Sequence, residues 1–427
     1  MNSPELSRVS ANPTDVMFRQ EGLNDRSPPI AGNACQATDL TLSFVGDPDL
    51  IREKWLEFER TAVCTFFQTH HWLSHWSRYA SPSYGETPFI VIGTDATGQL
   101  ALIWPMAKVR SMGATVLTWL GQSYNTYNMG IFRRGVLRAL GPDDVRAILS
   151  RIVEANPDID AFNFYHQPAH WDGLQNPFAL LPGTPSYLKS YVVRLEQDFE
   201  NFCKSRVSKK FQAKVRRMER RLAETGQVEC LLAQTPEERL AVFESFLRHK
   251  DYDLSRLGVS NAYRNPGLAR FLREIITCNE QEECFEVTSL TVDCDRLATI
   301  IGANFKQKFV CLILSMDNEN PLAKWSPGSI LIHDRFRNCH AQGTDVIDMG
   351  IGEGHHKNAW RPDELPMFNT HFAARFRGWP YSAGLLLSAR ARRFMRNNPY
   401  AWAVARRARD AARAMRSLYA RYASGRN

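Results

Sequence analysis

The chain has 427 residues, of which 44% are hydrophobic and 23% charged, a composition typical of a globular protein with two or three domains. It contains no run of about 18 uncharged apolar residues and no secretory signal, so we expect a cytoplasmic protein without a membrane-spanning helix. The nine cysteines form no CxxC pair, so we expect free thiols and no metal site. Of the net charge of +8, segment 387–427 contributes +10 through eleven arginines and one aspartate, and the remaining residues sum to −2.

A polar segment precedes the first folded region. Residues 1–38 lack periodicity, and we predict that they are disordered. We predict a first domain over 39–190. Its expected elements, in chain order, are a strand at 41–45, helices at 47–61 and 66–80, a hairpin at 88–109 that turns at 95–98, a strand at 114–121, a helix at 143–156 and a strand at 158–167.

A second domain is expected over 191–385, followed by an Arg-rich helical tail over 386–427. Its helix at 201–226 has a stripe of apolar residues at steps of three and four, and nine lysines and arginines on its other faces. The other expected elements are strands at 191–195 and 227–233, helices at 235–253 and 265–280, antiparallel strands at 284–290, 296–305 and 308–316, a helix that begins at 327, and a strand at 345–349. Both domains repeat one order of elements, which indicates a duplicated α+β fold with mixed, mainly antiparallel sheets flanked by helices.

A glycine-rich loop follows the last of these strands. The sequence DVIDMGIGEGHHK, at 345–357, places GxGxG after a strand, as in loops that bind S-adenosylmethionine. In a doubly wound domain this loop follows the first strand, whereas here only about 70 residues, mostly Arg-rich helix, follow Gly354. A methyltransferase that uses S-adenosylmethionine is therefore a minor alternative, and a turn that merely redirects the chain is another.

The helix that begins at Pro327-Gly328 is the better candidate for a cofactor site. Its first backbone N–H groups would favour a pyrophosphate, although an ordinary helix capped by Ser326 is the alternative. At the end of the preceding strand, backbone N–H groups would polarise a thioester carbonyl. The candidate donor site comprises Leu314, Ser315, Met316, Ser326, Pro327, Gly328, Ser329, Ile330 and Leu331.

The order strand, helix, helix, three antiparallel strands, phosphate turn, helix, strand resembles that of the GNAT acyl-CoA transferases. More closely, 40–384 resembles the tandem FemAB-like acyltransferases that include the CelD proteins. The resemblance rests on FFQTHHWLSHW, WLGQSYNTYNMGIF, KSRVSKKFQAKVRRMERRLAETG, SPGSILI and the residues from Asp348 to Trp360. The chain departs from the family where His356 replaces a common tyrosine, and where the phosphate signature is reduced to Pro327-Gly328.

The resemblance implies transfer of an acyl group from acyl-CoA to an amine or hydroxyl of a sugar or small precursor, in exopolysaccharide, cellulose or envelope biosynthesis. It implies a catalytic glutamate and lysine at Glu353 and Lys357, to which we add Asp348 at the strand end. His355 or His356 would relay a proton or contact the acceptor. The alternatives are that Asp348 binds loop N–H groups and that the histidines and Lys357 face solvent.

Aromatic and amide residues in the first domain are candidates for the acceptor site. Tyr124, Asn125, Tyr127 and Asn128 follow a strand, and exposed tyrosines and asparagines suit a sugar or peptide, although a turn packed by aromatics fits equally well. This domain lacks a comparable Pro-Gly turn, so we expect it to be catalytically silent.

Two basic segments suggest partners. The helix at 204–221 is either a solvated face over a packed stripe or a contact for CoA phosphate, an anionic acceptor or tRNA. The tRNA contact belongs to an alternative function, a Fem-type transferase that uses aminoacyl-tRNA; a further alternative is a non-catalytic accessory protein of a polysaccharide system. The tail at 387–427 is amphipathic and would lie on the anionic inner face of the membrane, or form an exposed basic helix.

Overall fold

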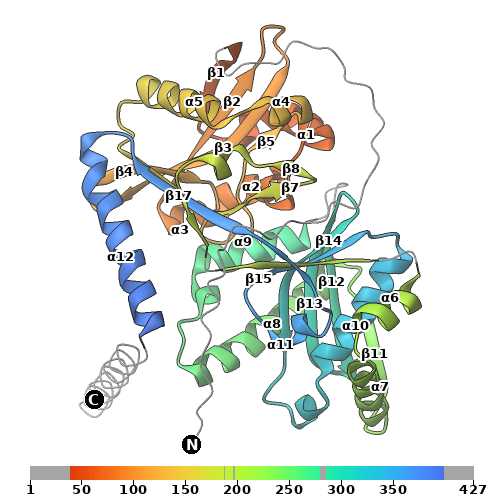
Figure 1. The fold of residues 1–427 in the computed structure, drawn as a ribbon. Helices are drawn as coiled ribbons and strands as arrows, with labels where there is room; N and C mark the ends of the chain where they lie inside the picture. The colour runs from red at the N-terminus through yellow and green to blue at the C-terminus, as the bar shows by residue number, and fades with distance from the viewer. Residues whose placement is uncertain (1–38, 187, 196–197, 279–284, 399–427) are drawn as a thin grey trace, which may run out of the picture. The chain divides into compact units, whose positions relative to one another are not determined.

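The computed structural model describes residues 39–186, 188–195, 198–278 and 285–398. The described elements form two large sheets with helices packed against them, and a separate two-stranded hairpin (Figure 1). This confirms the expected α+β class with mainly antiparallel sheets. The segment expected to be disordered and the part of the tail beyond residue 398 lie outside the described residues.

The first sheet is built from eight strands: β1 (Thr41–Val45), β2 (Glu86–Thr94), β3 (Leu100–Ser111), β4 (Ala114–Trp119), β5 (Ile131–Phe132), β6 (Ala161–Pro168), β9 (Thr184–Pro185) and β17 (Met367–Ala373). Their order is β1-β2-β3-β4-β6-β17-β9, with β5 paired to β3. Neighbours are antiparallel except β4 and β6, which pair in parallel over two residues each. The predicted hairpin with its turn at 95–98 is β2 and β3. The separate hairpin consists of β7 (His170–Trp171) and β8 (Leu174–Gln175).

Short helical segments pack with the first sheet: η2 (Pro48–Ile51), α1 (Arg52–Thr61), η3 (Phe66–Gln68), α2 (His70–His75), η4 (Trp76–Ala80), α3 (Ser81–Tyr84), α4 (Arg134–Ala139), α5 (Pro142–Ala155) and η5 (Pro177–Leu180). The single helix predicted at 66–80 is in fact a succession of 3-10, α and π turns. Thr69 causes one of the breaks, because its backbone is extended and its hydroxyl accepts the Trp72 N–H, which starts a new helix.

The second sheet contains seven strands: β10 (Ser190–Arg194), β11 (Val228–Leu232), β12 (Phe285–Val292), β13 (Asp295–Phe305), β14 (Lys308–Met316), β15 (Val346–Ile351) and β16 (Asp363–Leu365). Their order is β11-β12-β13-β14-β15-β10-β16, and only β14 and β15 are parallel neighbours. Along its strand order, each sheet therefore has four antiparallel strands, then one strand parallel to the fourth, then two further antiparallel strands. The repeat predicted from element order is a repeat of topology.

The helical segments of the second half are α6 (Phe199–Arg206), α7 (Lys209–Ala223), α8 (Pro236–Leu257), η6 (Ala262–Arg264), α9 (Pro266–Thr277), η7 (Pro321–Trp325), α10 (Pro327–Ala341), α11 (His355–Asn358), η8 (Phe376–Gly378) and α12 (Trp379–Asn397). The helix predicted at 201–226 is two helices, because Ser208 is extended and caps α7 by accepting the Phe211 N–H. The predicted start of α8 is confirmed: Thr235 forms a capping box with Glu238.

The chain crosses back to the first sheet near its end. β17 pairs with β6, with Phe372 opposite Phe162, and α12 packs against both strands (Figure 1). Residues 367–385, which the sequence assigned to the second domain, therefore complete the first sheet. The predicted second domain, 191–385, therefore includes residues that belong with the first sheet. Pairing between strands so far apart in the chain leaves no local pattern in the sequence from which to predict it.

The two halves share a hydrophobic core. Phe271 of α9 packs edge-on against Trp72 of α2 and Trp76 of η4, with ring centroids 4.9 and 5.2 Å apart. Phe66 of η3 makes a similar contact with Phe285 of β12 at 5.7 Å. Continuous burial of these aromatic rings fixes how residues from both sheets meet at the candidate site.

Candidate active site

Strands β14 and β15 part soon after they meet. They pair only from Lys308–Val346 to Val310–Asp348, and β14 then continues to Met316 alongside β13 alone. β14 also contains a β-bulge at Leu312. Cys311 and Ile313, on either side of it, pair with consecutive residues of β13, so Leu312 has no partner on that strand. Backbone groups of β14 beyond this bulge therefore face the space between the parted strands rather than a neighbouring strand.

A cavity of about 190 Å³ lies between these strands and α10. Its walls are mainly apolar, with one arginine, one histidine and one lysine, a lining typical of small-molecule sites. Of the predicted residues, Leu314, His356 and Lys357 line it. The full lining is Ile300, Phe309, Cys311, Leu312, Ile313, Leu314, Ile332, Arg335, Phe336, Ile347, Met349, His356 and Lys357.

Lys357 is held at the cavity wall by the end of β15. Its Nζ donates to the carbonyl oxygens of Gly350 and Ile351 at 2.9 and 3.0 Å, and the side chain is 6% exposed. Burial lowers the pKa of this ammonium, while nearby Cys311 and Asp348 act in the opposite direction. The alternative of a solvent-facing lysine is therefore wrong.

Asp348 lies on the opposite face of the same strand. Its neighbours Ile347 and Met349 line the cavity, so the alternating pleat directs Asp348 away from it. Oδ1 accepts the Gly350 N–H at 2.8 Å and the Tyr127 hydroxyl at 3.0 Å. Burial raises the pKa of this carboxyl to about 6, although these hydrogen bonds and the charge of Lys357 favour ionisation. A carboxyl with such a pKa is mostly ionised at pH 7 and is suited to accept a proton.

The third predicted catalytic residue stands apart. Glu353 is exposed, on the loop that follows β15. The structure thus places Lys357 on the cavity side of the end of β15 and Asp348 on the other side of this strand, and it leaves Glu353 at the surface. Its catalytic role remains a prediction.

A buried ion pair that sequence reasoning missed supports the cavity. Arg335 of α10 pairs with Glu286 of β12, and the Asn304 amide donates to the same carboxylate at 2.6 Å. Arg335 falls on the apolar stripe formed by Ile332, Phe336 and Cys339, and a charge on such a stripe is the signal that could have revealed it.

Cys311 is a candidate nucleophile that the geometry disfavours. It lines the cavity, but burial raises the pKa of its thiol to about 12. A thiol with that pKa remains protonated at neutral pH, and the protonated form is a poor nucleophile. Cys311 is therefore poorly suited to form a covalent intermediate in this cavity.

The start of α10 differs from the expected cap. Ser326 has a left-handed backbone, with φ of 47°, and its side chain makes no cap hydrogen bond. Its carbonyl oxygen accepts the N–H groups of Ser329 at 2.9 Å and Ile330 at 3.4 Å. The ordinary Ser-capped helix is thus wrong, and two of the N–H groups predicted for pyrophosphate already have a partner. A Cβ on Gly328 would meet only Met316, at 3.7 Å.

Ser315 points to the face of the sheet that α8 covers. Its hydroxyl lies 3.0 Å from Nδ1 of His249 and 2.7 Å from the Thr299 hydroxyl. His249 in turn lies 4.0 Å from Asp317. The Ser315 side chain therefore belongs to a buried polar network under the strand, which leaves only its backbone for the predicted donor site.

The predicted acceptor residues of the first domain are inside the molecule. Tyr127 and Asn128 are 1% and 0% exposed, so neither lines an open groove. Asn128 donates to the carbonyl of Tyr165 at 3.1 Å, and Tyr124 stacks on Trp72. The packed turn is thus the better of the two interpretations, although the hydroxyl of Tyr127 reaches the carboxylate of Asp348.

The equivalent position in the first sheet is filled. β4 and β6 also part after two pairs, but Trp119 and Phe164 pack across the opening with centroids 5.1 Å apart. Phe178 packs against both rings, at 5.1 and 5.5 Å. All three side chains are buried, so aromatic rings occupy the space that is a cavity in the second sheet.

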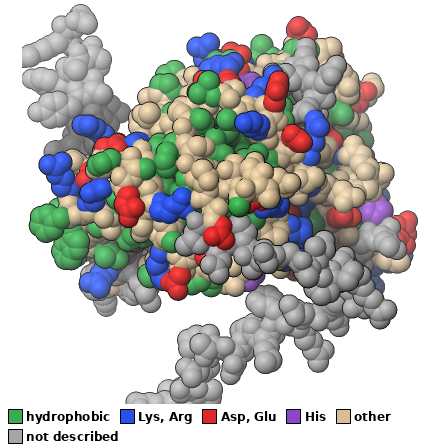
Figure 2. All heavy atoms as spheres, turned by 90° about the horizontal axis from the view of Figure 1, so that it is seen from above, with side chains coloured by type: hydrophobic (Ala, Val, Ile, Leu, Met, Phe, Trp, Pro, Cys, Tyr) green, Lys and Arg blue, Asp and Glu red, His purple; other side chains and the backbone are tan. Residues whose placement is uncertain are grey.

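The described surface carries charges of both signs, and the helix α7 exposes several cations. On the face shown in Figure 2, lysine and arginine side chains are interspersed with aspartate and glutamate. The helix α7, which packs against α10, exposes several cations above a buried stripe of Val215, Met218 and Leu222. The exposed cations of α7 are Lys209, Lys210, Lys214, Arg216, Arg217, Arg220 and Arg221.

Among the helices described, none combines the length and apolar character that crossing a bilayer requires.

A family model and solved structures are similar to parts of this chain. Residues 209–358, which span β11 to β15, match the family model of the acetyltransferase (GNAT) domain. The crystal structure of FemX matches with a TM-score of 0.50 and 10% identity, over 74% of this chain and 95% of that one. A conserved protein of unknown function from Bacteroides thetaiotaomicron matches with a TM-score of 0.49 and 12% identity, over 78% and 99%. No curated protein matches in sequence. At these identities the likeness to FemX concerns the fold alone.

Proposed function

We propose that this chain, which has the GNAT fold and an acetyltransferase (GNAT) domain at 209–358, is an acyltransferase that uses acyl-CoA. The observation that carries the proposal is the cavity where β14 and β15 part, with the buried Lys357 on its wall. The acceptor is an amine or hydroxyl of a sugar or small precursor, with envelope or exopolysaccharide biosynthesis as the setting. The second domain carries the reaction, and aromatic filling of the first sheet supports a silent first domain.

The parted strands suggest how the substrates are arranged. The thioester carbonyl would lie against the backbone of β14, where N–H groups near Leu314 and the Lys357 ammonium stabilise the developing oxyanion. As the acceptor attacks, the Asp348 carboxylate behind β15 takes the proton that the amine or hydroxyl loses, and the thiolate of CoA leaves.

Calorimetric titration of the full chain with acetyl-CoA and longer acyl-CoAs tests the proposal. We expect binding that Gly328→Glu abolishes, because the carboxylate would stand at the start of α10, where the donor's phosphates are expected. Gly135→Glu is the matched control, since it adds the same charge at an exposed site in α4 with nothing within 4 Å. No heat with any acyl-CoA would overturn acyl-CoA as donor, and equal binding by both variants would overturn the donor site at the start of α10.

A second candidate is transfer of an aminoacyl group from tRNA. The exposed cations of α7 favour it, because they lie on a helix that packs against α10, beside the candidate donor site. This function requires tRNA affinity that falls steeply with salt and is lost when Lys210 and Lys214 become glutamate. It also requires that acyl-CoA does not bind, so the two titrations separate the candidates.

We also propose that the protein is cytoplasmic and associates with the inner face of the membrane. Phe376 of η8 and Trp379, the first residue of α12, are 93% and 68% exposed, and Leu386 and Leu387 follow on α12. Aromatic and leucine side chains next to an Arg-rich segment suit an anionic lipid surface. Flotation with anionic vesicles should recover the wild type and lose Trp379→Ser.

A further inference from the structure

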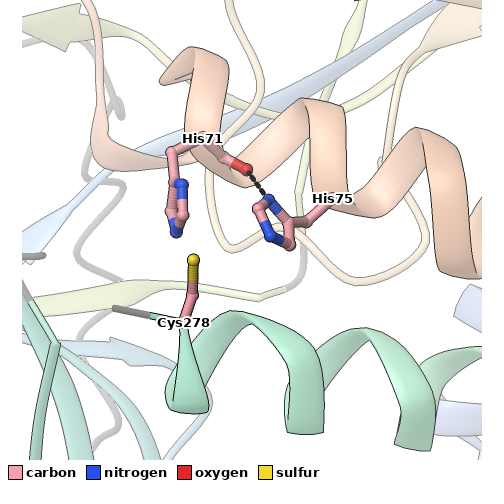
Figure 3. Close-up of side chains that lie close together, drawn as sticks. All are labelled: His71, His75 and Cys278. Carbon is pink, nitrogen blue, oxygen red and sulfur yellow. Dashed lines mark hydrogen bonds between the residues drawn. The ribbon is translucent and has the colours of Figure 1, made fainter. Parts of the chain in front are cut away.

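A cluster of metal-binding side chains lies apart from the cavity, at the junction of the two halves. His71 and His75 are four residues apart on α2, and Cys278 directly follows α9. Their ligand atoms all lie within 4.8 Å of one another. Figure 3 shows the sulfur of Cys278 directed at both imidazole rings. We propose that these three side chains bind a divalent transition metal ion, zinc above all, between α2 and α9.

The donor atoms select the class of metal. Two imidazoles and one thiolate suit zinc and similar transition metals, whereas magnesium and calcium prefer oxygen ligands. Three protein ligands leave a fourth position for water or another small ligand. No metal site was expected from the sequence because the cysteines form no CxxC pair. Here the fold supplies the third ligand from a residue some 200 positions away.

The histidines are prepared for this role by their surroundings. Nδ1 of His75 lies 2.9 Å from the carbonyl oxygen of His71, which favours the tautomer with the ring proton on Nδ1 (Figure 3). The two imidazole rings stand one helical turn apart on α2 and lie beside the sulfur of Cys278.

The site is enclosed yet accessible. All three side chains are half-buried, so a metal ion can enter from solvent. The two imidazole rings lie 4.4 Å apart, and the ring of Phe285 lies 6.1 Å from that of His71. Because α2 belongs to the first half and α9 to the second, a bound ion would tie the halves together and stabilise the folded chain.

Zinc binding by the full chain, after removal of metal with a chelator, tests the proposal. We expect one zinc per chain, bound at least tenfold more weakly by Cys278→Ser, and a rise in Tm with zinc that this variant lacks. His75→Gln, a second variant, should behave alike if the serine variant folds poorly. Cys294→Ser, at an exposed cysteine, is the control and should bind zinc as the wild type does.

Cobalt replacement gives an independent readout. Co²⁺ bound through Cys278 should show a thiolate-to-metal charge-transfer band in wild type and Cys294→Ser, and none in Cys278→Ser. Equal zinc affinity in Cys278→Ser and wild type, or cobalt bound without that band, would overturn the site. Neither measurement depends on acyl transfer, so the outcome is separate from that of the proposed function.

Discussion

Replacement of Asp348 by asparagine should change how the stability of the protein depends on pH. Burial raises the pKa of this carboxyl from 3.8 to about 6 in the folded chain. The folded state therefore binds the proton more tightly than the unfolded state, and the protonated carboxyl stabilises the folded protein. This contribution to the free energy of unfolding is present in full below about pH 4 and is lost as the pH rises through about 6. At about 1.4 kcal/mol for each pKa unit, the loss amounts to about 3 kcal/mol.

Asparagine stays neutral at every pH and keeps a side-chain oxygen that accepts the Gly350 N–H and the Tyr127 hydroxyl. The free energy of unfolding of Asp348→Asn, relative to wild type, should thus rise by about 3 kcal/mol between pH 4 and pH 7. Urea unfolding of both proteins at each pH measures this, and the subtraction cancels the other titrating groups. Asp345→Asn, at an exposed position just before β15, is the matched control substitution. A flat or falling difference for Asp348→Asn itself would refute burial of the carboxyl as the cause.

Three other substitutions test the cavity and its frame. Lys357→Met removes the ammonium from the cavity wall, and we expect release of CoA thiol from the donor to slow by about 10²-fold; unchanged turnover would exclude a role in the reaction. Gly302→Ala would press a methyl group into the ring of Phe309, which should cost about 1–3 kcal/mol in urea unfolding, and full stability would contradict this packing. Glu286→Gln leaves Arg335 buried without its carboxylate, so we expect a loss of about 3–5 kcal/mol and a lower Tm; an unchanged Tm would mean that the pair contributes little.

Much of the fold could be predicted from local patterns. The cap at Thr235, the hairpin turn at 95–98 and the apolar stripe of α7 each depend on residues close together in the chain. The order of elements then indicated the repeat. Lys357 was identified through a family resemblance, and its burial and hydrogen bonds agree with a specific role without testing it.

The parts that sequence reasoning missed depend on distant contacts. The return of β17 to the first sheet and the approach of Cys278 to α2 require segments far apart in the chain to meet. The burial of Tyr127 is similar: its surroundings come from both halves, because Ser190 and Asp348 both contact its hydroxyl. A tyrosine in a turn looks exposed until the second half packs over it.

The return of β17 also affects how the protein is made. β6 ends at Pro168 and β17 begins at Met367, so the ribosome must synthesise the whole second half before the first sheet receives this strand. Until then the edge of β6 that β17 will cover is open to other strands, in this chain or in a neighbouring one. Nascent chains that stall before residue 367 should therefore aggregate or hold a chaperone, even when the second sheet has already formed. The half that is synthesised first is completed last.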